Sequence, residues 1–285
     1  MLVDLHLHST ASDGAYAPGE VVRLAVERGM RLIALTDHDS VDGVAEAAAA
    51  AKETGVALIP GVELSCEGEL EVHLLGYGMD ASAPAWRRFF DALQRERRER
   101  ALRVVALLRE MGYAIDERAV TDVSAHSVSR AHIAQALMAA RVVGSVKEAF
   151  SRLLSPGRPA YLPRPPLALA EAASLMRAER VAPVLAHPGL LRMTESAVEQ
   201  RVRAWREQGL MGIEVYHPYH TPAQIRRLDR LARSLGLLVT GGSDAHGEPV
   251  RPARIGDGLE NWRTRDRDAL ALWQAVPHTV GDPFA

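Results

Sequence analysis

The chain has few of the features that define several common protein classes. Among its 285 residues only one is a cysteine, Cys66, which excludes an intramolecular disulfide and a zinc site built from several thiolates. No apolar run approaches the length of a membrane span, and no basic stretch precedes an apolar one at the N-terminus. We therefore expect a cytoplasmic protein with no membrane association.

The chain also lacks an excess of either charge. Its 34 Lys and Arg against 36 Asp and Glu give a net charge of −2, so no global positive field would hold a nucleic acid, and any such binding must be local. Only two of the basic residues are lysines, Lys52 and Lys147. Hydrophobic residues at 47% and charged residues at 25% are ordinary values for a folded protein.

Short runs rich in Val, Ile and Leu alternate with longer segments of helical spacing, which is typical of repeated β-α units with parallel strands. The predicted strands lie at 2–8, 31–37, 56–64, 71–77, 182–187, 212–217 and 237–243. The predicted fold class is therefore α/β. Seven strands with mostly helical connections are consistent with a barrel or an open parallel sheet.

About a hundred residues separate the strand ending near Tyr77 from the one beginning near Ala182. A loop of that length in a compact domain needs structure of its own, and its sequence is helical in character. We predict a helical insertion at 100–165, which interrupts a main domain formed by 1–99 and 166–285.

The segment Arg87 to Arg109 carries eight arginines interleaved with glutamates. One interpretation is a solvent-exposed helix face with ion pairs between successive turns. The other is a helix that passes near a phosphate-rich ligand, and the sequence leaves both open.

Histidines and carboxylates gather where the predicted strands end. Alternation along Asp4-Leu-His6-Leu-His8 places the acid and both imidazoles on one face of a strand, where two imidazoles can bind one metal ion. Because parallel α/β folds hold ligands at the carboxyl ends of strands, the joint pattern predicts a metal site. The candidate ligands are His6, His8, Asp13, His38, Glu63, His73, His187, Asp244 and His246.

These nine candidates are too many for one ion. Imidazoles and carboxylates without thiolates suit Zn, Mn or Fe. Shared among three ions, with Glu63 bridging two of them, they leave positions open for water and substrate. Sites of several ions can clamp a phosphoryl group and deliver a metal-bound hydroxide to phosphorus, so the chemistry indicates phosphoester hydrolysis.

The sequence resembles the PHP (polymerase and histidinol phosphatase) family over essentially its whole length. The resemblance rests on His6-Leu-His8 with Ser9, Ser12-Asp13-Gly14, Thr36-Asp37-His38, Gly61-Val-Glu63, His73, His187-Pro188 and Ser243-Asp244-Ala-His246. Two further phrases resemble the stand-alone phosphoesterases of this family, namely Gly212-Ile-Glu-Val-Tyr-His217-Pro and Ser127-Val-Ser-Arg130-Ala-His132. Members of that branch act on nucleoside 3′,5′-bisphosphates and on the 5′ ends of short RNA.

This resemblance implies a distorted (β/α)7 barrel with three divalent metal ions in its mouth. The implied ligand sets are His6, His8, Glu63 and Asp244 for the first ion, Glu63, His73 and His187 for the second, and Asp13, His38 and His246 for the third. We expect Mn, Fe or Zn, with Mn favoured because Asp13 is a hard ligand. A hydroxide bridging the first two ions would attack phosphorus, which makes Glu63 and Asp244 catalytic candidates.

The remaining candidates surround this centre. His217 follows the sixth strand and would touch the substrate or protonate the leaving oxygen, or else order its loop. In the insertion, Arg130 and His132 are predicted to bind substrate, with Arg130 gripping a second phosphate, unless they have surface or helix-cap roles. Arg158 and Tyr161 are similar candidates, and Tyr161 could stack on a base.

Two further carboxylates flank His38. Asp37 and Asp39 could orient imidazoles from behind the ligands. Equally, Asp39 could cap the helix that follows, and the sequence does not decide between these roles.

The leading hypothesis is a phosphatase that removes a phosphate from a nucleotide carrying two, or that trims RNA from a 5′-phosphorylated end. Histidinol-phosphate phosphatase is a second hypothesis, supported by the shared family alone. A non-catalytic module of a polymerase is disfavoured because none of the nine ligand positions is lost. An amidohydrolase is disfavoured because neither Lys52 nor Lys147 ends a strand. We expect a small-molecule nucleotide as the binding partner and no obligate protein partner.

Overall fold

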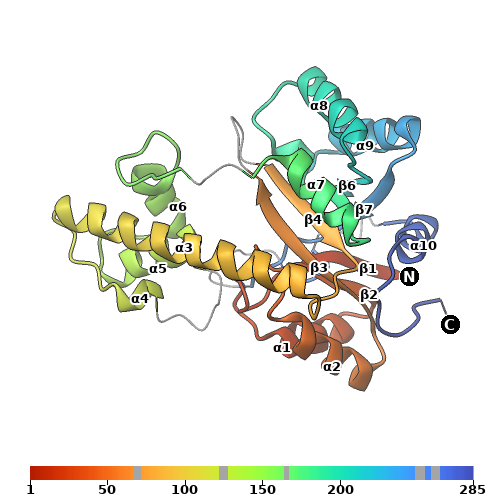
Figure 1. Cartoon of the computed structure of the whole chain (residues 1–285), viewed down its shortest axis with the longest axis horizontal. Coiled ribbons are helices and arrows are strands. Elements are labelled where there is room, and N and C mark those ends of the chain that lie inside the picture. Colours follow the sequence, from red (N-terminus) through yellow and green to blue (C-terminus); the bar gives the residue numbers. More distant parts are fainter. Residues whose placement is uncertain (67–71, 122–127, 164–166, 248–253, 258–263, 285) are drawn as a thin grey trace.

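The computed structural model describes residues 1–66, 72–121, 128–163, 167–247, 254–257 and 264–284 (Figure 1). Seven strands form one sheet in chain order. They are β1 (Leu2–Leu7), β2 (Met30–Leu35), β3 (Ala57–Cys66), β4 (Val72–Tyr77), β5 (Ala182–Leu185), β6 (Gly212–Tyr216) and β7 (Leu238–Gly241). Each begins and ends within two residues of its predicted position, so the α/β class and all seven strands are confirmed.

The prediction of parallel pairing is wrong at one strand. β4 pairs antiparallel with both β3 and β5, whereas the other described pairs are parallel. The reason lies in the length of the connection. A parallel crossover needs about a dozen residues or more, and only residues 67–71 separate β3 from β4.

Six helices, two before β3 and four after residue 166, pack against the strands. They are α1 (Pro18–Glu27), α2 (Val44–Thr54), α7 (Leu169–Ala178), α8 (Glu195–Glu207), α9 (Pro222–Leu235) and α10 (Asp266–Ala275). The apolar faces of α1 and α2 share one core with β1 and β2, while α7, α8 and α9 share another with β3 to β7. In the described part of the chain, no helix combines the length and the apolar character that a membrane crossing requires.

The sheet curls until its two edges meet. The backbone N–H of Asp244, just after β7, donates to the carbonyl of His6 in β1 at 2.9 Å, and His8 N–H donates to Ala245 at 3.1 Å. The hydroxyl of Tyr77 in β4 donates to the carbonyl of Leu5 in β1 at 2.9 Å, although two strands lie between them in the sheet. This curvature brings the carboxyl ends of distant strands together.

One helix connects the sheet to the helical region. α3 (Pro84–Glu110) is 27 residues long and projects away from the sheet (Figure 1). Near its start, Trp86 and Phe90 pack in the core of the sheet. Near its end, Val104 and Leu108 pack in a separate core. The predicted boundary at residue 100 thus falls inside one continuous helix, between the turns that serve the two cores.

The second core belongs to the short helices between α3 and α7. These are α4 (Arg118–Thr121), α5 (Arg130–Ala139), α6 (Val146–Ala149) and the π-helical turn η1 (Phe150–Leu154). Figure 1 shows them gathered around the far half of α3. Ser129 begins α5 as its N-cap, with its hydroxyl accepting from the backbone of Ala131.

The contact between β1 and the segment after β7 generates a test at Gly242. A Cβ at this position would lie 2.3 Å from the Cβ of His6 and 2.5 Å from its backbone nitrogen. Gly242→Ala must therefore displace β1, and we expect it to lower the free energy of unfolding in urea by about 1–3 kcal/mol. Gly144→Ala is the control, because its nearest neighbour is the end of the Glu148 side chain at 3.5 Å. Equal free energies for the two variants would contradict this packing.

Candidate metal centre and pocket

The predicted metal ligands converge at the carboxyl ends of the strands. Among the described residues, three groups of side chains have donor atoms that all lie within 4.8 Å of one another inside the group. The groups are His6, His8, Glu63 and Asp244; His8, Asp13, His38 and His246; and His38, Glu63 and His73. Curvature of the sheet brings these residues together from β1, β3, β4 and the segments that follow β1, β2 and β7.

Glu63 lies at the centre of this cluster and is fully buried. Its Oε2 is 3.0 Å from Nε2 of His6 and 3.3 Å from Nε2 of His8. Its Oε1 is 2.8 Å from Nδ1 of His73 and 3.0 Å from Nε2 of His187. Nδ1 of His38 is also 3.2 Å from Oε2. The two carboxylate oxygens therefore face different sets of histidines, as a carboxylate shared by two metal ions would require.

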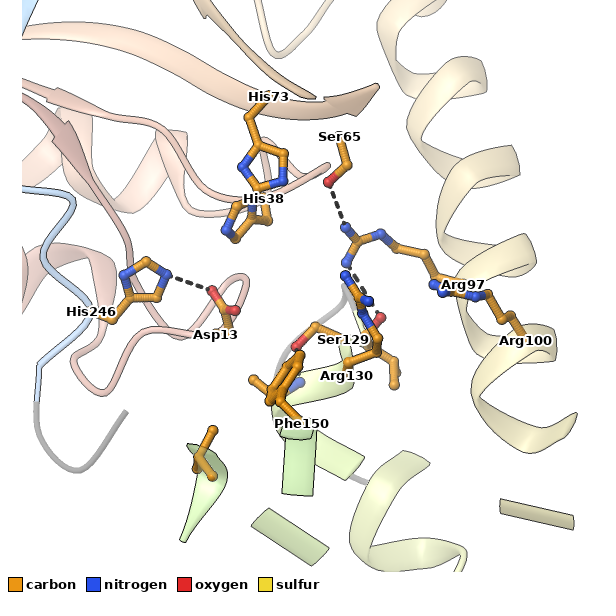
Figure 2. Close-up of a pocket in the computed structure, with 13 residues that line it drawn as sticks. Asp13, His38, Ser65, His73, Arg97, Arg100, Ser129, Arg130, Phe150 and His246 are labelled. Atoms are coloured by element: carbon orange, nitrogen blue, oxygen red, sulfur yellow. Dashed lines mark hydrogen bonds and ion pairs between the residues drawn. The ribbon is translucent and has the colours of Figure 1, made fainter. Parts of the chain in front are cut away.

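Two other carboxylates, those of Asp244 and Asp13, contact further histidines of the cluster. Asp244 Oδ1 is 3.2 Å from Nε2 of His8 and 3.6 Å from Nε2 of His6. Asp13 Oδ1 is 3.2 Å from Nε2 of His246 (Figure 2). The rings of His8 and His246 stack with centroids 4.0 Å apart, so the Asp13 group adjoins the group around Glu63.

The donor chemistry of these side chains fits divalent metal ions. His6 hydrogen-bonds Glu214 through Nδ1 at 2.9 Å, and His246 hydrogen-bonds the carbonyl of Asp244 through Nδ1 at 2.9 Å. When Nδ1 carries the proton, the lone pair of Nε2 points into the cluster. Both ring nitrogens of His8 and Nδ1 of His38 are buried without a hydrogen bond to any described residue. A metal ion would satisfy these buried nitrogens, which otherwise cost free energy.

The charge states of Glu63 and His38 agree with this chemistry. Burial raises the pKa of Glu63, but the nearby His38, His6 and His73 hold it well below its usual value, so the carboxylate is ionised. Burial lowers the pKa of His38 well below its usual value, despite the carboxylates of Glu63 and Asp13. An ionised carboxylate and a neutral imidazole are the forms that bind metals. Burial lowers the pKa of His6 and His8, but the surrounding carboxylates raise it above its usual value, so an ion bound there would displace a proton.

Glu214 is a functional residue that the sequence analysis missed. It is fully buried in β6, where Oε1 contacts Nδ1 of His6 and Oε2 accepts from the backbone N–H of His187 at 2.7 Å. Glu214 thus orients His6, which faces Oε2 of Glu63, and the backbone of His187, whose ring faces Oε1. The signal was present in the phrase Gly212-Ile-Glu-Val-Tyr, in which a single acid interrupts an apolar strand.

Three other buried acids, Asp4, Asp37 and Asp39, hold the segments that carry ligands. Asp4 accepts from the backbone and hydroxyl of Ser243 at 2.9 and 2.6 Å, next to Asp244. Asp37 accepts from the hydroxyls of Ser9 and Ser12 at 2.7 and 2.6 Å, so the expectation that it orients an imidazole is wrong for the described residues.

Asp39 does not cap the following helix. The N-cap of α2 is Gly43, which makes no side-chain cap bond. Asp39 instead accepts from the backbone N–H of Ser65 at 2.8 Å and forms a buried ion pair with Arg97 of α3.

The loop that carries His187 is held by β6 and α9. His187 has a φ of +30°. Two residues later, Gly189 donates its N–H to Nε2 of His220 at 3.1 Å and accepts from Nε2 of Gln224 at 2.8 Å. The other nitrogen of His220 bonds the carbonyl of Val215 at 2.9 Å. His220 is therefore neutral in this arrangement, with its proton on Nδ1.

A pocket of about 320 Å³ lies between the cluster and the helical region (Figure 2). On the cluster side it is lined by Asp13, His38, His73 and His246. On the other side it is lined chiefly by Arg97, Arg100, Ser129, Arg130 and Phe150. The pocket thus has metal-ligating groups on one wall and guanidinium groups on the other, a combination that suits a ligand with several negative charges.

Of the four predicted substrate residues, only Arg130 lines this pocket. Its guanidinium lies over the rings of Phe150 and Tyr161, with centroids at 5.6 and 5.7 Å. His132 is buried and its Nδ1 accepts from the backbone N–H of Ser129, as part of the cap of α5. Arg158 is exposed and is not among the residues that line the pocket.

The arginines of α3 divide between the two interpretations. Arg97 and Arg100 are buried and line the pocket. The other six are exposed, namely Arg87, Arg88, Arg95, Arg98, Arg103 and Arg109. The helix is therefore solvent-exposed on one face and faces the ligand pocket on the other.

His217 lies on the side of the cluster near Asp244. Its Nε2 is 3.6 Å from Asp244 Oδ2, and its Nδ1 accepts from the backbone N–H of Tyr219 at 3.3 Å. Because Nδ1 is an acceptor, Nε2 carries the proton in the neutral ring.

Comparisons with known proteins agree with this centre. The sequence model of the PHP domain matches residues 4–101. A 3′,5′-nucleoside bisphosphate phosphatase of Chromobacterium violaceum is 34% identical, over 86% of this chain and 87% of the relative. The 5′-3′ exoribonuclease Rnm of Escherichia coli is 31% identical, over 98% of this chain and 96% of the relative. A Bifidobacterium adolescentis structure described as a metal-dependent phosphoesterase has a TM-score of 0.86 and 29% identity, covering 96% of each chain.

Fold, cluster and relatives together define a metal-dependent hydrolase that acts on phosphoesters. The chain belongs to the PHP family, as its motifs predicted. The protein is therefore an enzyme, and the hypothesis of a non-catalytic polymerase module is set aside.

Glu214 provides a test of the support behind the ligands. Glu214→Gln keeps the shape but removes the charge opposite His6, so we expect metal affinity to fall about 10- to 100-fold in a competitive chelator titration. Glu53→Gln, which changes an exposed acid of α2, should leave the affinity unchanged. An unaltered affinity in Glu214→Gln would show that His6 needs no such partner.

His220 provides a test in pH. Burial lowers its pKa to about 4, so the unfolded chain, with a pKa near 6.5, binds the proton more readily. Stability from neutral His220 is present above about pH 6.5 and is lost as the pH falls toward 4. Between pH 7 and pH 5, the metal-free wild type should lose about 2 kcal/mol more unfolding free energy than His220→Gln. Parallel pH profiles for the two proteins in urea unfolding would be evidence against this role.

Proposed function

We propose that this enzyme hydrolyses a phosphate monoester of nucleoside 3′,5′-bisphosphates, such as adenosine 3′,5′-bisphosphate to AMP, and acts on the 5′ ends of short RNA. The observation that carries the proposal is the guanidinium of Arg130 on the wall of the pocket opposite the metal-ligating cluster. One phosphate at the cluster and a second at Arg130 would occupy both walls. The names of the relatives from C. violaceum and E. coli support the same substrate class.

We propose three divalent ions at the cluster, with Mn favoured, held by the ligand sets implied by the family resemblance. The contacts of Glu63 Oε2 with His6 and His8, and of Oε1 with His73 and His187, support the first two sets. Ions bound there supply positive charge for phosphate oxygens and water activated toward neutral pH. Glu63 and Asp244 hold and orient that charge.

We propose His217 as the group that protonates the leaving oxygen. The hydrogen bond from Tyr219 to Nδ1 orients the ring so that Nε2 faces Asp244 at the edge of the cluster, which is the position a proton donor to the substrate needs. Tyr161 and His132 act on substrate through Arg130. Tyr161 packs against the guanidinium, and His132 fixes the cap that begins α5. For Arg158 the exposed position supports no more than an outer contact with a longer substrate.

We further propose that the curled sheet is the distorted (β/α)7 barrel of the family, on the support of the bonds between β1 and the end of β7. The separate core formed by the far half of α3 supports the division into a main domain, at 1–99 and 166–285, and an insertion at 100–165. A single, buried, free cysteine supports a cytoplasmic, reducing location.

Phosphate release with Mn²⁺ tests the proposed substrate. We expect faster turnover of adenosine 3′,5′-bisphosphate, or of a short 5′-phosphorylated RNA, than of AMP or histidinol phosphate, because only the former two place a second phosphate near Arg130. His8→Ala should abolish release and lower metal content, which assigns the activity to this centre. Preference for histidinol phosphate would overturn the nucleotide assignment while leaving the metal centre intact.

A further inference from the structure

One buried guanidinium joins the metal-ligating strands to the helical region. Arg97 lies midway along α3 and is 5% exposed. It forms an ion pair with Asp39 and donates to the hydroxyl of Ser65 at 3.4 Å and to the carbonyl of Val128 at 3.3 Å. Figure 2 shows its contact with Ser65 at the edge of the pocket. The three partners come from three separate segments of the chain.

Two of these partners adjoin proposed metal ligands. Asp39 directly follows His38 and has a φ of +48°. Its backbone N–H donates to the carbonyl of Glu63 at 3.0 Å, and its carboxylate accepts from the N–H of Ser65 at 2.8 Å. Asp39 therefore ties the segment after β2 to the end of β3, and Arg97 balances its buried charge.

The third partner adjoins the proposed phosphate-binding residue. Val128 precedes Ser129, which caps α5, and Arg130 is the first residue of that helix. A hydrogen bond to the carbonyl of Val128 thus fixes the chain two residues before Arg130. Both contacts of Arg97, with Asp39 and with Val128, use the same planar guanidinium.

We infer that Arg97 is a positioning residue that sets the separation between Arg130 and the metal centre. It thereby sets the preference of the enzyme for substrates with a second phosphate, an inference that rests on the proposed function. The planar guanidinium donates in several fixed directions, so it can hold Asp39, Ser65 and Val128 together. The ammonium of a lysine is a point charge on a flexible stem and would keep the ion pair without this geometry.

Kinetics of Arg97→Lys test this role. The variant keeps a positive charge beside Asp39, so we expect the folded protein and its manganese content to be retained. The ratio of kcat/KM for adenosine 3′,5′-bisphosphate to that for p-nitrophenyl phosphate should fall about tenfold, mainly through KM for the bisphosphate. Arg103→Lys, an exposed arginine of the same helix, is the matched control and should keep the wild-type ratio. Should Arg97→Lys not fold, Arg97→Gln combined with Asp39→Asn serves the same comparison, because it removes both charges of the buried pair together.

A double variant tests whether Arg97 acts through Arg130. Arg130→Ala alone should lower the same ratio, and Arg97→Lys combined with Arg130→Ala should lower it no further. Additive losses in the double variant, or equal losses of Arg97→Lys on both substrates with loss of manganese, would overturn the inference.

Hydrogen exchange separates this inference from the proposed function. Without substrate, the amides of residues 130–139 should exchange faster in Arg97→Lys than in wild type, while those of β3 should be unaffected. If the wild type shows no preference for the bisphosphate, the proposed substrate is wrong, and exchange still decides whether Arg97 holds α5. Unchanged exchange across α5 would refute the positioning role in either case.

Discussion

The carboxylate of Glu63 is the contact on which the rest of this structure depends. Its two oxygens face histidines from different segments of the chain, with His6, His8 and His38 near Oε2 and His73 and His187 near Oε1. A carboxylate buried so completely is stable only among groups that compensate its charge. The histidines, and the metal ions for which they are suited, provide that compensation. The curvature of the sheet is therefore tied to the chemistry of the site.

Buried acids behind the ligands hold the side chains and loops of this cluster in fixed positions. Glu214 orients His6 and the backbone of His187, and Asp4 holds the segment that carries Asp244. None of these acids needs to touch a metal. Each one instead satisfies buried donors that would otherwise leave a ligand loop free to adopt several positions. The site is rigid where the chemistry requires fixed distances.

The helical region places arginine side chains on the wall of the pocket opposite this centre. α3 contributes to both hydrophobic cores, so its first half is anchored on the sheet and its second half supports α5. The buried pair between Arg97 and Asp39 connects the two parts where the pocket lies between them. An insertion of this kind can vary in sequence and change the substrate without disturbing the metal ligands, because the ligands lie on the strands.

The sequence alone determined the seven strands and the donor atoms, because alternation, turn spacing and side-chain chemistry are local properties. It could also have revealed the antiparallel β4, since five residues cannot form a helical crossover. Only the tertiary structure decided which donor groups lie within reach of one another and which arginines of α3 face the pocket. Arg97 and Arg103 are chemically identical, and packing alone buries one and exposes the other. Glu214 is a mixed case: an acid within an apolar strand is visible in the sequence, but its bond to His6 spans 208 residues of chain and is set by the fold.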